Sequence, residues 1–437
     1  MGALSACTQI PVAPDHHACT DIYRAAEYRA AHSYLPYTPI AGAAFLRVDR
    51  QLASQIPRAS TPELRLQWLR WANAMANEAL ALGAPSCIDP LLQHLANDKR
   101  AWQKLVARAT VPAEYRTSLR ALGLYPVTRL AFLAGVNREL AHTAEEQAAF
   151  SDDAMAWQLF APASGAGWHT SPVLEGVNGV AWSSLFDRWA PQFALPSGSG
   201  AANLPGSLVR TGEGQLRFDG RDPRVYVYPS LGWFNGRQTL QLNYQIWFLE
   251  RPAQGPLDFL SGTLDGLHWR VHLTMGGEPI AFDAMHTCGC WYQLYPAAGY
   301  VALAPESFWQ EPHYVGPIQA LSAGPRLYLS ADTHRLLAVR PSAPPQAAVS
   351  MPMTPVQWAS GGVVGPLTAD AIHYWSIFNR AGRVPESLRS ERFFFWPMGV
   401  PAAGSHRAPG HHAVAFTGRR HFDDPAILDE LIQAPGR

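Results

Sequence analysis

Residues 240–248 read Leu-Gln-Leu-Asn-Tyr-Gln-Ile-Trp-Phe, and apolar and polar side chains alternate along the stretch. Such alternation is typical of a β-strand that buries one of its faces. Asn235-Gly236 lies just upstream and predicts a hairpin turn. We therefore expect 240–248 to pair with residues 224–228 or 233–234 in an antiparallel sheet that has one apolar face.

Residues 267–273 show the same alternation, and Gly276-Gly277 predicts a turn back into residues 280–284. With a two-residue turn, Leu267 would oppose His286, which places His286 at the end of the apolar face. The other face would carry three polar side chains: His268, His272 and Asp283. A β-bulge near the turn would reverse this assignment.

The N-terminal part of the chain has helical periodicity instead. Residues 64–79 carry apolar side chains at three- and four-residue spacing, and Ser60-Thr61-Pro62-Glu63 before them is typical of a helix start. The other predicted helices span residues 89–106, 113–122, 127–142 and 424–433. Short loops between the first four predict antiparallel neighbours in a bundle.

These patterns predict an α+β protein, with a helical N-terminal domain followed by an antiparallel β-sandwich or partly open β-barrel domain. The predicted parts are a lipobox and tether at 1–18, a helical domain at 19–160, an irregular connector at 161–206, the β domain at 207–400 and a C-terminal segment with a final helix at 401–437.

Composition narrows the classes of partner. The 437 residues include 34 basic and 34 acidic side chains and no polybasic block, which argues against nucleic acid as a partner because phosphates require a basic surface. No run of about 18 apolar residues predicts a membrane span. Apart from any attached lipid, we expect the body of the chain to dissolve in water.

Leu4-Ser5-Ala6-Cys7 resembles the lipobox of bacterial lipoproteins. The resemblance implies that Cys7 carries acyl chains, which would hold the protein on a membrane. Thr8, rather than an aspartate, follows the cysteine, and this implies the outer membrane, facing the periplasm. The alternative is a frayed N-terminus with a cysteine there by chance.

Cys19 and Cys87 flank predicted helices, and the periplasm permits disulfides. A bridge between these two cysteines would contribute about 4 kcal/mol by loop-closure entropy. Two buried free thiols are the alternative interpretation.

His286-Thr287-Cys288-Gly289-Cys290 is a dense cluster of soft ligands. In a strand, His286, Cys288 and Cys290 would share one face, and imidazole with two thiolates suits zinc or copper. A further ligand would come from elsewhere, with His411 or His412 as the C-terminal candidates. Two other interpretations stay open: a glycine-containing turn with buried free cysteines, or a strained or mixed disulfide.

The body of the chain, roughly residues 110–433, contains four stretches that are similar to a family of uncharacterised proteobacterial proteins. These are Leu242-Asn243-Tyr244-Gln245-Ile246-Trp247-Phe248, Leu264-Asp265-Gly266-Leu267-His268-Trp269-Arg270-Val271, His286-Thr287-Cys288-Gly289-Cys290 and Arg420-His421-Phe422-Asp423-Asp424. The resemblance implies no particular activity.

Taken together, the sequence predicts a cell-envelope lipoprotein that binds a small molecule or an envelope protein without catalysis. Fifteen tryptophans and fifteen tyrosines could line a binding groove. The alternative is a metal-dependent enzyme or metal carrier that uses zinc or copper at His286, Cys288 and Cys290.

Overall fold

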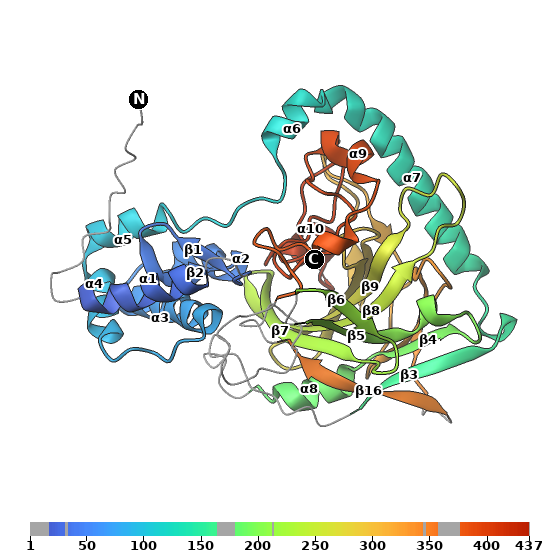
Figure 1. Ribbon diagram of the computed structural model, residues 1–437, viewed down its shortest axis with the longest axis horizontal. Coiled ribbons are helices and arrows are strands. Elements are labelled where there is room, and N and C mark those ends of the chain that lie inside the picture. Colours follow the sequence, from blue (N-terminus) through green and yellow to red (C-terminus); the bar gives the residue numbers. More distant parts are fainter. Residues whose placement is uncertain are drawn as a thin grey trace.

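A computed structural model describes residues 17–30, 34–163, 180–211, 214–343, 347–356 and 376–436 of the chain. Figure 1 shows a small helical domain beside a large curled sheet, with further helices along the far edge of the sheet. Among the described residues, no helix is both long enough and apolar enough to cross a bilayer.

The helical domain is built from five helices and a two-stranded hairpin. These elements are α1 His17–Arg29, β1 Thr38–Ile40, β2 Ala43–Val48, α2 Arg50–Ser54, α3 Pro62–Leu80, α4 Ile88–Asn97 and α5 Lys99–Val106. Helix α3 begins where the capping pattern predicts, because the side chain of Thr61 accepts a hydrogen bond from the Leu64 amide at 3.3 Å. Trp68 and Leu69 of α3 are buried in the core of this domain.

The sheet has eleven strands in one continuous path, in the order β13-β11-β10-β9-β8-β7-β16-β3-β4-β14-β15, and it curls into a half-barrel. Its strands are β3 Trp157–Ala163, β4 Gln192–Pro196, β7 Val225–Phe234, β8 Arg237–Arg251, β9 Gly262–Thr274, β10 Pro279–His286, β11 Gln293–Pro296, β13 Tyr314–Val315, β14 Pro325–Leu329, β15 Leu336–Pro341 and β16 Ala348–Pro355. Strands β5 Pro205–Arg210 and β6 Leu216–Asp219 form a hairpin that joins the sheet at β8, and β12 Val301–Ala302 pairs with β17 Ile432–Gln433.

The inner face of the half-barrel holds the main hydrophobic core. Leu242 of β8, Trp269 of β9 and Phe282 of β10 are fully buried there. Helix α8, Trp182–Trp189, buries Phe186 and Trp189 in the same core. The outer face of β8 to β10 is also covered, by α10 Ile427–Leu431 and the rest of the C-terminal segment.

The 3-10 turn η2 Ile56–Arg58 belongs to the helical domain. The remaining helices lie along the sheet and at one end of it. They are α6 Thr117–Leu122, α7 Tyr125–Ala149, α9 Arg392–Phe395 and the 3-10 turns η3 Asp152–Ala154, η4 Ala201–Asn203, η6 Pro385–Ser387 and η7 Trp396–Met398. Helix α7 contacts β13, β15 and η7.

Several predictions about the fold are confirmed. Residues 240–248 lie in β8, and the hairpin at Asn235-Gly236 pairs Phe234 with Arg237. Leu267 opposes His286 as expected, although a bulge lies between Pro279 and Ala281 next to the turn. The bulge lies next to the turn and leaves the predicted pairing beyond it unchanged. The side chains along the rest of β10 therefore point to the predicted faces of the sheet.

Other predictions are wrong. The helices at 113–122 and 127–142 do not join a bundle with the helical domain, because α7 packs on the sheet. Residues 161–206 are not an irregular connector where the structure describes them, since they contribute to β3, β4 and β5 and contain α8. The sheet is not purely antiparallel either, because β16 runs parallel to both β3 and β7. The last helix begins at Ile427, later than Asp424-Pro425.

Candidate functional site

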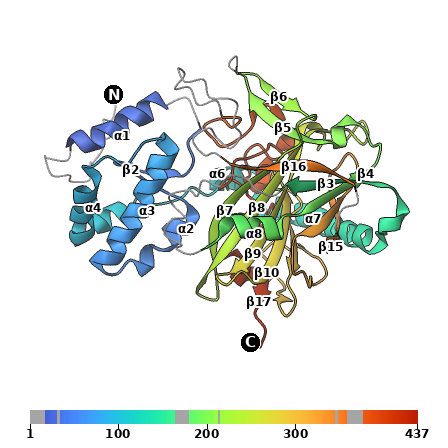
Figure 2. The same cartoon turned by 90° about the horizontal axis from the view of Figure 1, so that it is seen from below.

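A cavity of about 640 Å³ lies between the helical domain and the outer face of the sheet. In Figures 1 and 2 the helical domain sits beside β7, with α2 nearest to it. Trp233 of β7 bridges the two parts: its indole nitrogen donates to Ser54 Oγ at 3.2 Å, and the Arg58 guanidinium lies 4.2 Å above its ring. The cavity therefore has walls from both parts of the chain.

The floor of the cavity is a polar layer on the outer face of the sheet. Tyr228 opposes Asn243, and Asn243 opposes Arg270, so these side chains form one row across β7, β8 and β9. Asn243 Nδ2 donates to Ser230 Oγ at 2.9 Å, and Ser230 Oγ donates to Gln241 Oε1 at 2.7 Å. These bonds hold the amides of the floor in one orientation.

Arg270 carries the one charge of this row, and Asp283 of β10 neutralises it. The guanidinium donates to both carboxylate oxygens, at 2.9 and 2.5 Å, and also to the carbonyl of Phe422. Burial raises the pKa of Asp283, but the charge of Arg270 outweighs burial and holds that pKa well below its usual value. Desolvation lowers the pKa of His268, which lies on the same face, to about 3, so this imidazole is neutral.

The opposite wall comes from the helical domain and contains Asp49 and Arg50. Asp49 caps α2 by accepting a hydrogen bond from the Leu52 amide at 2.6 Å. Burial, with a further contribution from Asp423, raises the pKa of Asp49 to about 6. Arg50 Nε lies 3.0 Å from Asp423 Oδ2, and this ion pair joins the helical domain to the C-terminal segment.

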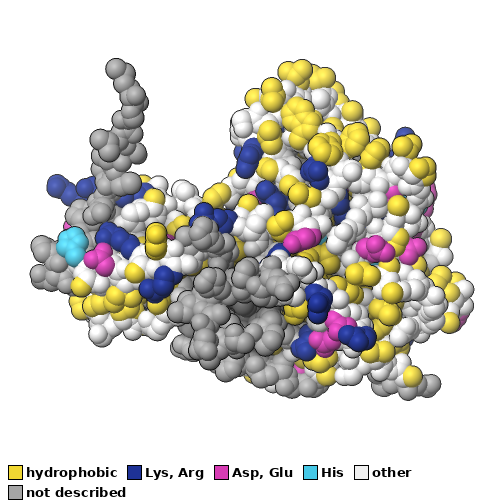
Figure 3. Space-filling model, viewed as in Figure 1, with side chains coloured by type: hydrophobic (Ala, Val, Ile, Leu, Met, Phe, Trp, Pro, Cys, Tyr) yellow, Lys and Arg dark blue, Asp and Glu magenta, His cyan; other side chains and the backbone are white. Residues whose placement is uncertain are grey.

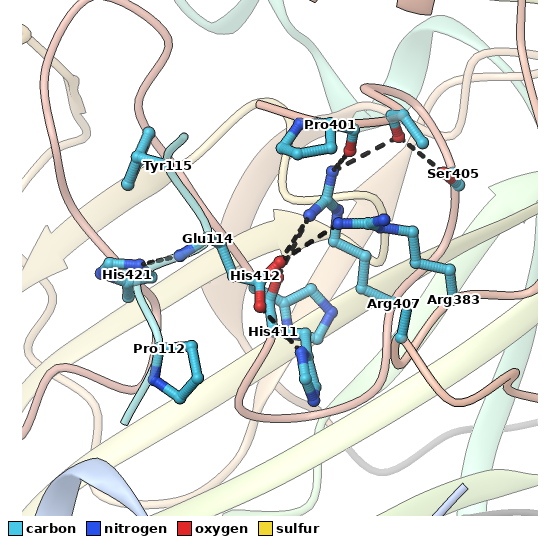
Figure 4. A network of polar contacts seen from close by, with 12 residues as sticks. Pro112, Glu114, Tyr115, Arg383, Pro401, Ser405, Arg407, His411, His412 and His421 are labelled. Atoms are coloured by element: carbon cyan, nitrogen blue, oxygen red, sulfur yellow. Dashed lines mark hydrogen bonds and ion pairs between the residues drawn. The ribbon is translucent and has the colours of Figure 1, made fainter. Parts of the chain in front are cut away.

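A third wall is centred on Glu114, in the linker between the helical domain and α6 (Figure 4). Its carboxylate pairs with His411 at 2.9 Å and with Arg383 and Arg407 at 3.3 and 3.4 Å. Burial raises the pKa of Glu114, but the bond from His411 and the two arginines reverse this, so that the pKa is lowered. The Glu114 amide also donates to His421 Nε2 at 3.1 Å. The linker is thus fastened to the C-terminal segment.

The cavity is nearly balanced in charge. Of the four arginines in its lining, Arg47, Arg50 and Arg270 each have a carboxylate partner inside the protein, and the fourth, Arg380, is exposed. The aromatic side chains in the walls are Tyr34, Tyr37, Trp71, Tyr228 and Phe422. Within the described residues, both polar atoms of the Gln51 amide and Asp423 Oδ1 lack a hydrogen-bond partner. The cavity thus combines aromatic surface with hydrogen-bonding groups.

The predicted metal residues do not converge. His286 Nδ1 lies 3.2 Å from Asp265 Oδ1, and the other oxygen of Asp265 lies 2.9 Å from His334 Nδ1. Burial raises the pKa of Asp265, but His286 and Arg389 hold it well below its usual value. His334 stacks on Phe248, with ring centroids 3.8 Å apart. His286 is therefore part of a buried hydrogen-bond network around Asp265.

Cys288 and Cys290 do not continue strand β10, which ends at His286. The chain turns there, because the His286 amide donates to the Cys290 carbonyl at 2.9 Å and Gly289 adopts a φ of +92°. Both cysteines are free thiols. The turn interpretation is confirmed, although only Cys288 is fully buried and Cys290 is partly exposed. The expectation of one shared strand face is wrong because the strand stops four residues before Cys290.

His412 lies beside this turn, but it does not complete a ligand set. Its Nε2 donates to the Thr287 carbonyl at 3.1 Å. His411 instead pairs with Glu114 in the cavity wall. In the part of the chain that the structure describes, no group of three or more His, Cys, Asp or Glu side chains is arranged to hold a metal ion. The structure thus does not support the predicted zinc or copper site.

The disulfide prediction has the opposite outcome. Cys19 of α1 and Cys87, just before α4, form a disulfide with their Cα atoms 5.8 Å apart. Cys7 and the lipobox lie outside the described residues, so lipidation stays a prediction.

Several residues of the cavity were not predicted. The polar positions Gln241, Asn243 and Arg270 were assigned to one face of the sheet, but nothing in the sequence indicated that protein would cover that face. Asp49 gave a weak local signal, because an aspartate before Arg50-Gln51-Leu52 is a common helix cap. The contact between Arg50 and Asp423 spans most of the chain and has no local signal.

The two predicted resemblances concern the lipobox and the body from about residue 110, and the geometry of the described residues tests neither. No protein-family model, no curated protein and no solved structure matches the chain. Both resemblances stay predictions, and the chemistry of the cavity itself is the guide to function.

Proposed function

We propose that this chain is a cell-envelope protein that binds a small, uncharged, hydroxyl-rich molecule, such as a mono- or disaccharide, in the cavity between its helical domain and its sheet. One observation carries the proposal. The amide side chains of Gln241 and Asn243 on β8 and the aromatic side chains of the walls line the same cavity of about 640 Å³. Small-molecule sites have volumes of about 300–1,000 Å³ and combine apolar surface with a few oriented polar groups.

The charges favour a neutral ligand. Arg270 is paired with Asp283, Arg50 with Asp423, and His411 with Glu114. An anionic ligand would have to compete with these carboxylates for the cations. The Gln51 amide is buried without a hydrogen-bond partner among the described residues, and a rotation of its side chain into the cavity would let it donate to and accept from hydroxyl groups.

The location is proposed on separate grounds. The sequence around Cys7 resembles a lipobox, and the disulfide between Cys19 and Cys87 is of a kind that persists in oxidising compartments such as the periplasm. We propose a lipid anchor on Cys7 in the outer membrane. The mass of the N-terminal peptide from cells that export the protein tests this part, since an unmodified thiol would contradict it.

Binding is tested by thermal unfolding of the full chain with neutral saccharides (glucose, N-acetylglucosamine and their disaccharides) and with charged ones (glucuronate and glucose phosphate). A ligand present at about 100 times its Kd stabilises the native state by about 2.7 kcal/mol. We expect neutral saccharides to raise Tm and Gln51→Ala to weaken their binding about thirtyfold, because two hydrogen bonds of about 1 kcal/mol each are lost.

Gln103 provides the matched control, because it is an exposed glutamine of α5 in the same domain and does not line the cavity. Gln103→Ala should bind saccharides like the wild-type chain. The proposal is wrong if only the charged sugars stabilise the protein, if none of the neutral saccharides does, or if Gln51→Ala binds as tightly as the wild-type chain.

A further inference from the structure

Helix α7 presents apolar side chains to solvent over its first half. Val127, Leu130, Ala131 and Ala134 share one face of the helix at three- and four-residue spacing, and all four are exposed. Only Arg129 and Thr143 of this 25-residue helix are buried. The face that an amphipathic helix normally buries is thus turned outward.

Neighbouring segments extend this apolar face into one patch. The apolar cap consists of Leu122 of α6, Leu124 just after it, Val127 and Leu130 of α7, and Phe393 and Phe394 of α9. Their exposed fractions run from 49% for Phe394 to 74% for Leu122. Figure 3 shows hydrophobic side chains gathered over this projecting end of the molecule. Single exposed apolar residues are ordinary, but a contiguous group marks an interaction site.

The cap rests on a rigid support. Gly123 lies directly against Pro397, so closely that a Cβ at this position would be 2.5 Å from the proline Cβ. Arg120 Nε donates to the Met398 carbonyl at 2.8 Å, and the rings of Phe132 and Phe395 lie 5.3 Å apart. The apolar side chains are thus held outward by packed structure beneath them.

Arginines outnumber acidic residues in and next to the segments of the cap. Residues 115–138 and 392–400 contain five arginines, of which Arg120 and Arg129 are buried. The acidic residues that flank these ranges, Glu114, Glu139 and Glu391, each interact with an arginine of the protein. Arg116 and Arg138 are exposed, and the Arg392 guanidinium lies 4.4 Å from the centre of the Phe393 ring. Projecting leucine, valine and phenylalanine side chains with arginines around them match the apolar interior and anionic headgroups of a lipid surface.

We propose that the apolar cap inserts into the surface of a phospholipid membrane that contains anionic lipids. The cap is convex, whereas a helix or strand of a protein partner would need a groove or an open sheet edge. The proposal depends on neither the cavity nor the acyl chain. If Cys7 also carries an acyl chain, the cap would be a second point of contact with the bilayer and would fix the orientation of the protein there.

The test uses the full chain with Cys7→Ser, which cannot be acylated, and vesicles of phosphatidylethanolamine and phosphatidylglycerol in equal amounts. In cosedimentation, we expect Val127→Asp with Phe393→Asp to reduce the partition coefficient at least tenfold, because charged groups replace two inserted apolar ones. Arg116→Gln should reduce it about fivefold on these vesicles and leave it unchanged on neutral phosphatidylcholine.

The matched controls introduce aspartate at exposed apolar side chains outside the cap. Val301→Asp on β12 and Tyr28→Asp on α1 also replace exposed apolar side chains, 60% and 84% exposed, and should partition like the parent chain. Equal partitioning of the cap variant and the parent would overturn the proposal. A parent chain that sediments as a dimer in solution, and is made monomeric by the cap substitutions, would overturn it in favour of a second copy as the occupant.

Discussion

Strands β8, β9 and β10 bury both of their faces, but by different chemistry. On the inner face, Leu242, Trp269 and Phe282 pack among other apolar side chains. On the outer face, Asn243 and Arg270 are each 1% exposed and are held by hydrogen bonds. Alternation along a strand shows only that its two faces differ. Whether the polar face meets water or protein depends on the rest of the chain.

The two faces should respond differently to substitution. Apolar packing is non-directional, so the cost of a change depends on the volume that it removes. A buried polar group depends on a particular partner, and loss of the partner leaves an unpaired group in a medium of low dielectric constant. Three experiments can sharpen or break this contrast.

The largest effect is expected for Arg270→Met on the outer face. This change leaves the Asp283 carboxylate buried without its ion pair, and breaking such a pair costs about 3–5 kcal/mol. The free energy of unfolding from urea titration measures the loss. Adding Asp283→Leu should recover much of it, because a pair of apolar residues removes the unpaired charge.

Trp269→Ala, one position away on the inner face, is the matched control. It should cost about 3–5 kcal/mol through the cavity it leaves, and Asp283→Leu should not recover this loss, since Trp269 packs in the core on the opposite face of the sheet. A double variant Arg270→Met with Asp283→Leu that is no more stable than Arg270→Met alone would contradict the partner dependence of the outer face.

Alanine substitutions at two adjacent residues of β8 should differ in how much they lower the free energy of unfolding, and this difference is smaller than the effect of Arg270→Met. Leu242→Ala should reduce the free energy of unfolding by about 2–5 kcal/mol, since it empties volume in the core. Asn243→Ala should reduce it by about 1–2 kcal/mol, because the bonds to Ser230 and to the Tyr228 carbonyl are lost. Urea titrations of the two variants in parallel give the comparison, and equal losses would contradict it.

The inner face could be predicted from the sequence because its signals are local. Alternation in β8 and β9, the turn at Asn235-Gly236 and the opposition of Leu267 and His286 all depend on residues near one another in the chain. Each of these features follows from periodicity or turn chemistry alone. The pairing of Cys19 with Cys87 joins residues 68 apart, and the sequence indicates it only through the helices that the two cysteines flank.

The outer face could not be predicted in the same way. Its cover comes from the C-terminal segment and from the helical domain, through contacts such as Arg50 with Asp423. The parallel pairing of β16 with β3 and β7 also joins distant parts of the chain. The metal interpretation of residues 286–290 assumed that the strand continues, whereas Gly289 turns the chain. Long-range contacts decided the first two points, and a local turn that the alternation pattern does not reveal decided the third.

Two carboxylates beside the outer face should give stability opposite dependences on pH. Arg270 lowers the pKa of Asp283, so the stability contributed by this group is present above its unfolded pKa of about 4 and is lost as the pH falls through the folded value. Burial raises the pKa of Asp49 to about 6. Its stability contribution is present below pH 4 or so, and is lost as the pH rises to the folded value.

Asp49→Asn isolates the pH dependence that comes from Asp49. This is the smallest effect among the three experiments. Asparagine can still cap α2, but it does not titrate. Between a pH of about 4 and about 7, the free energy of unfolding of the variant should rise by about 1–2 kcal/mol relative to that of the wild type. The upper limit follows from about 1.4 kcal/mol per unit of pKa shift, and water that reaches the cavity reduces it. Urea titrations across this pH range measure the difference.

Asp98→Asn is the control. Asp98 also caps a helix, α5, but its pKa is lowered. The stability of Asp98→Asn relative to wild type should therefore not increase as the pH rises. A difference for Asp49→Asn that is constant with pH would mean that the carboxylate is solvated, and that the helical domain does not close over the outer face of the sheet.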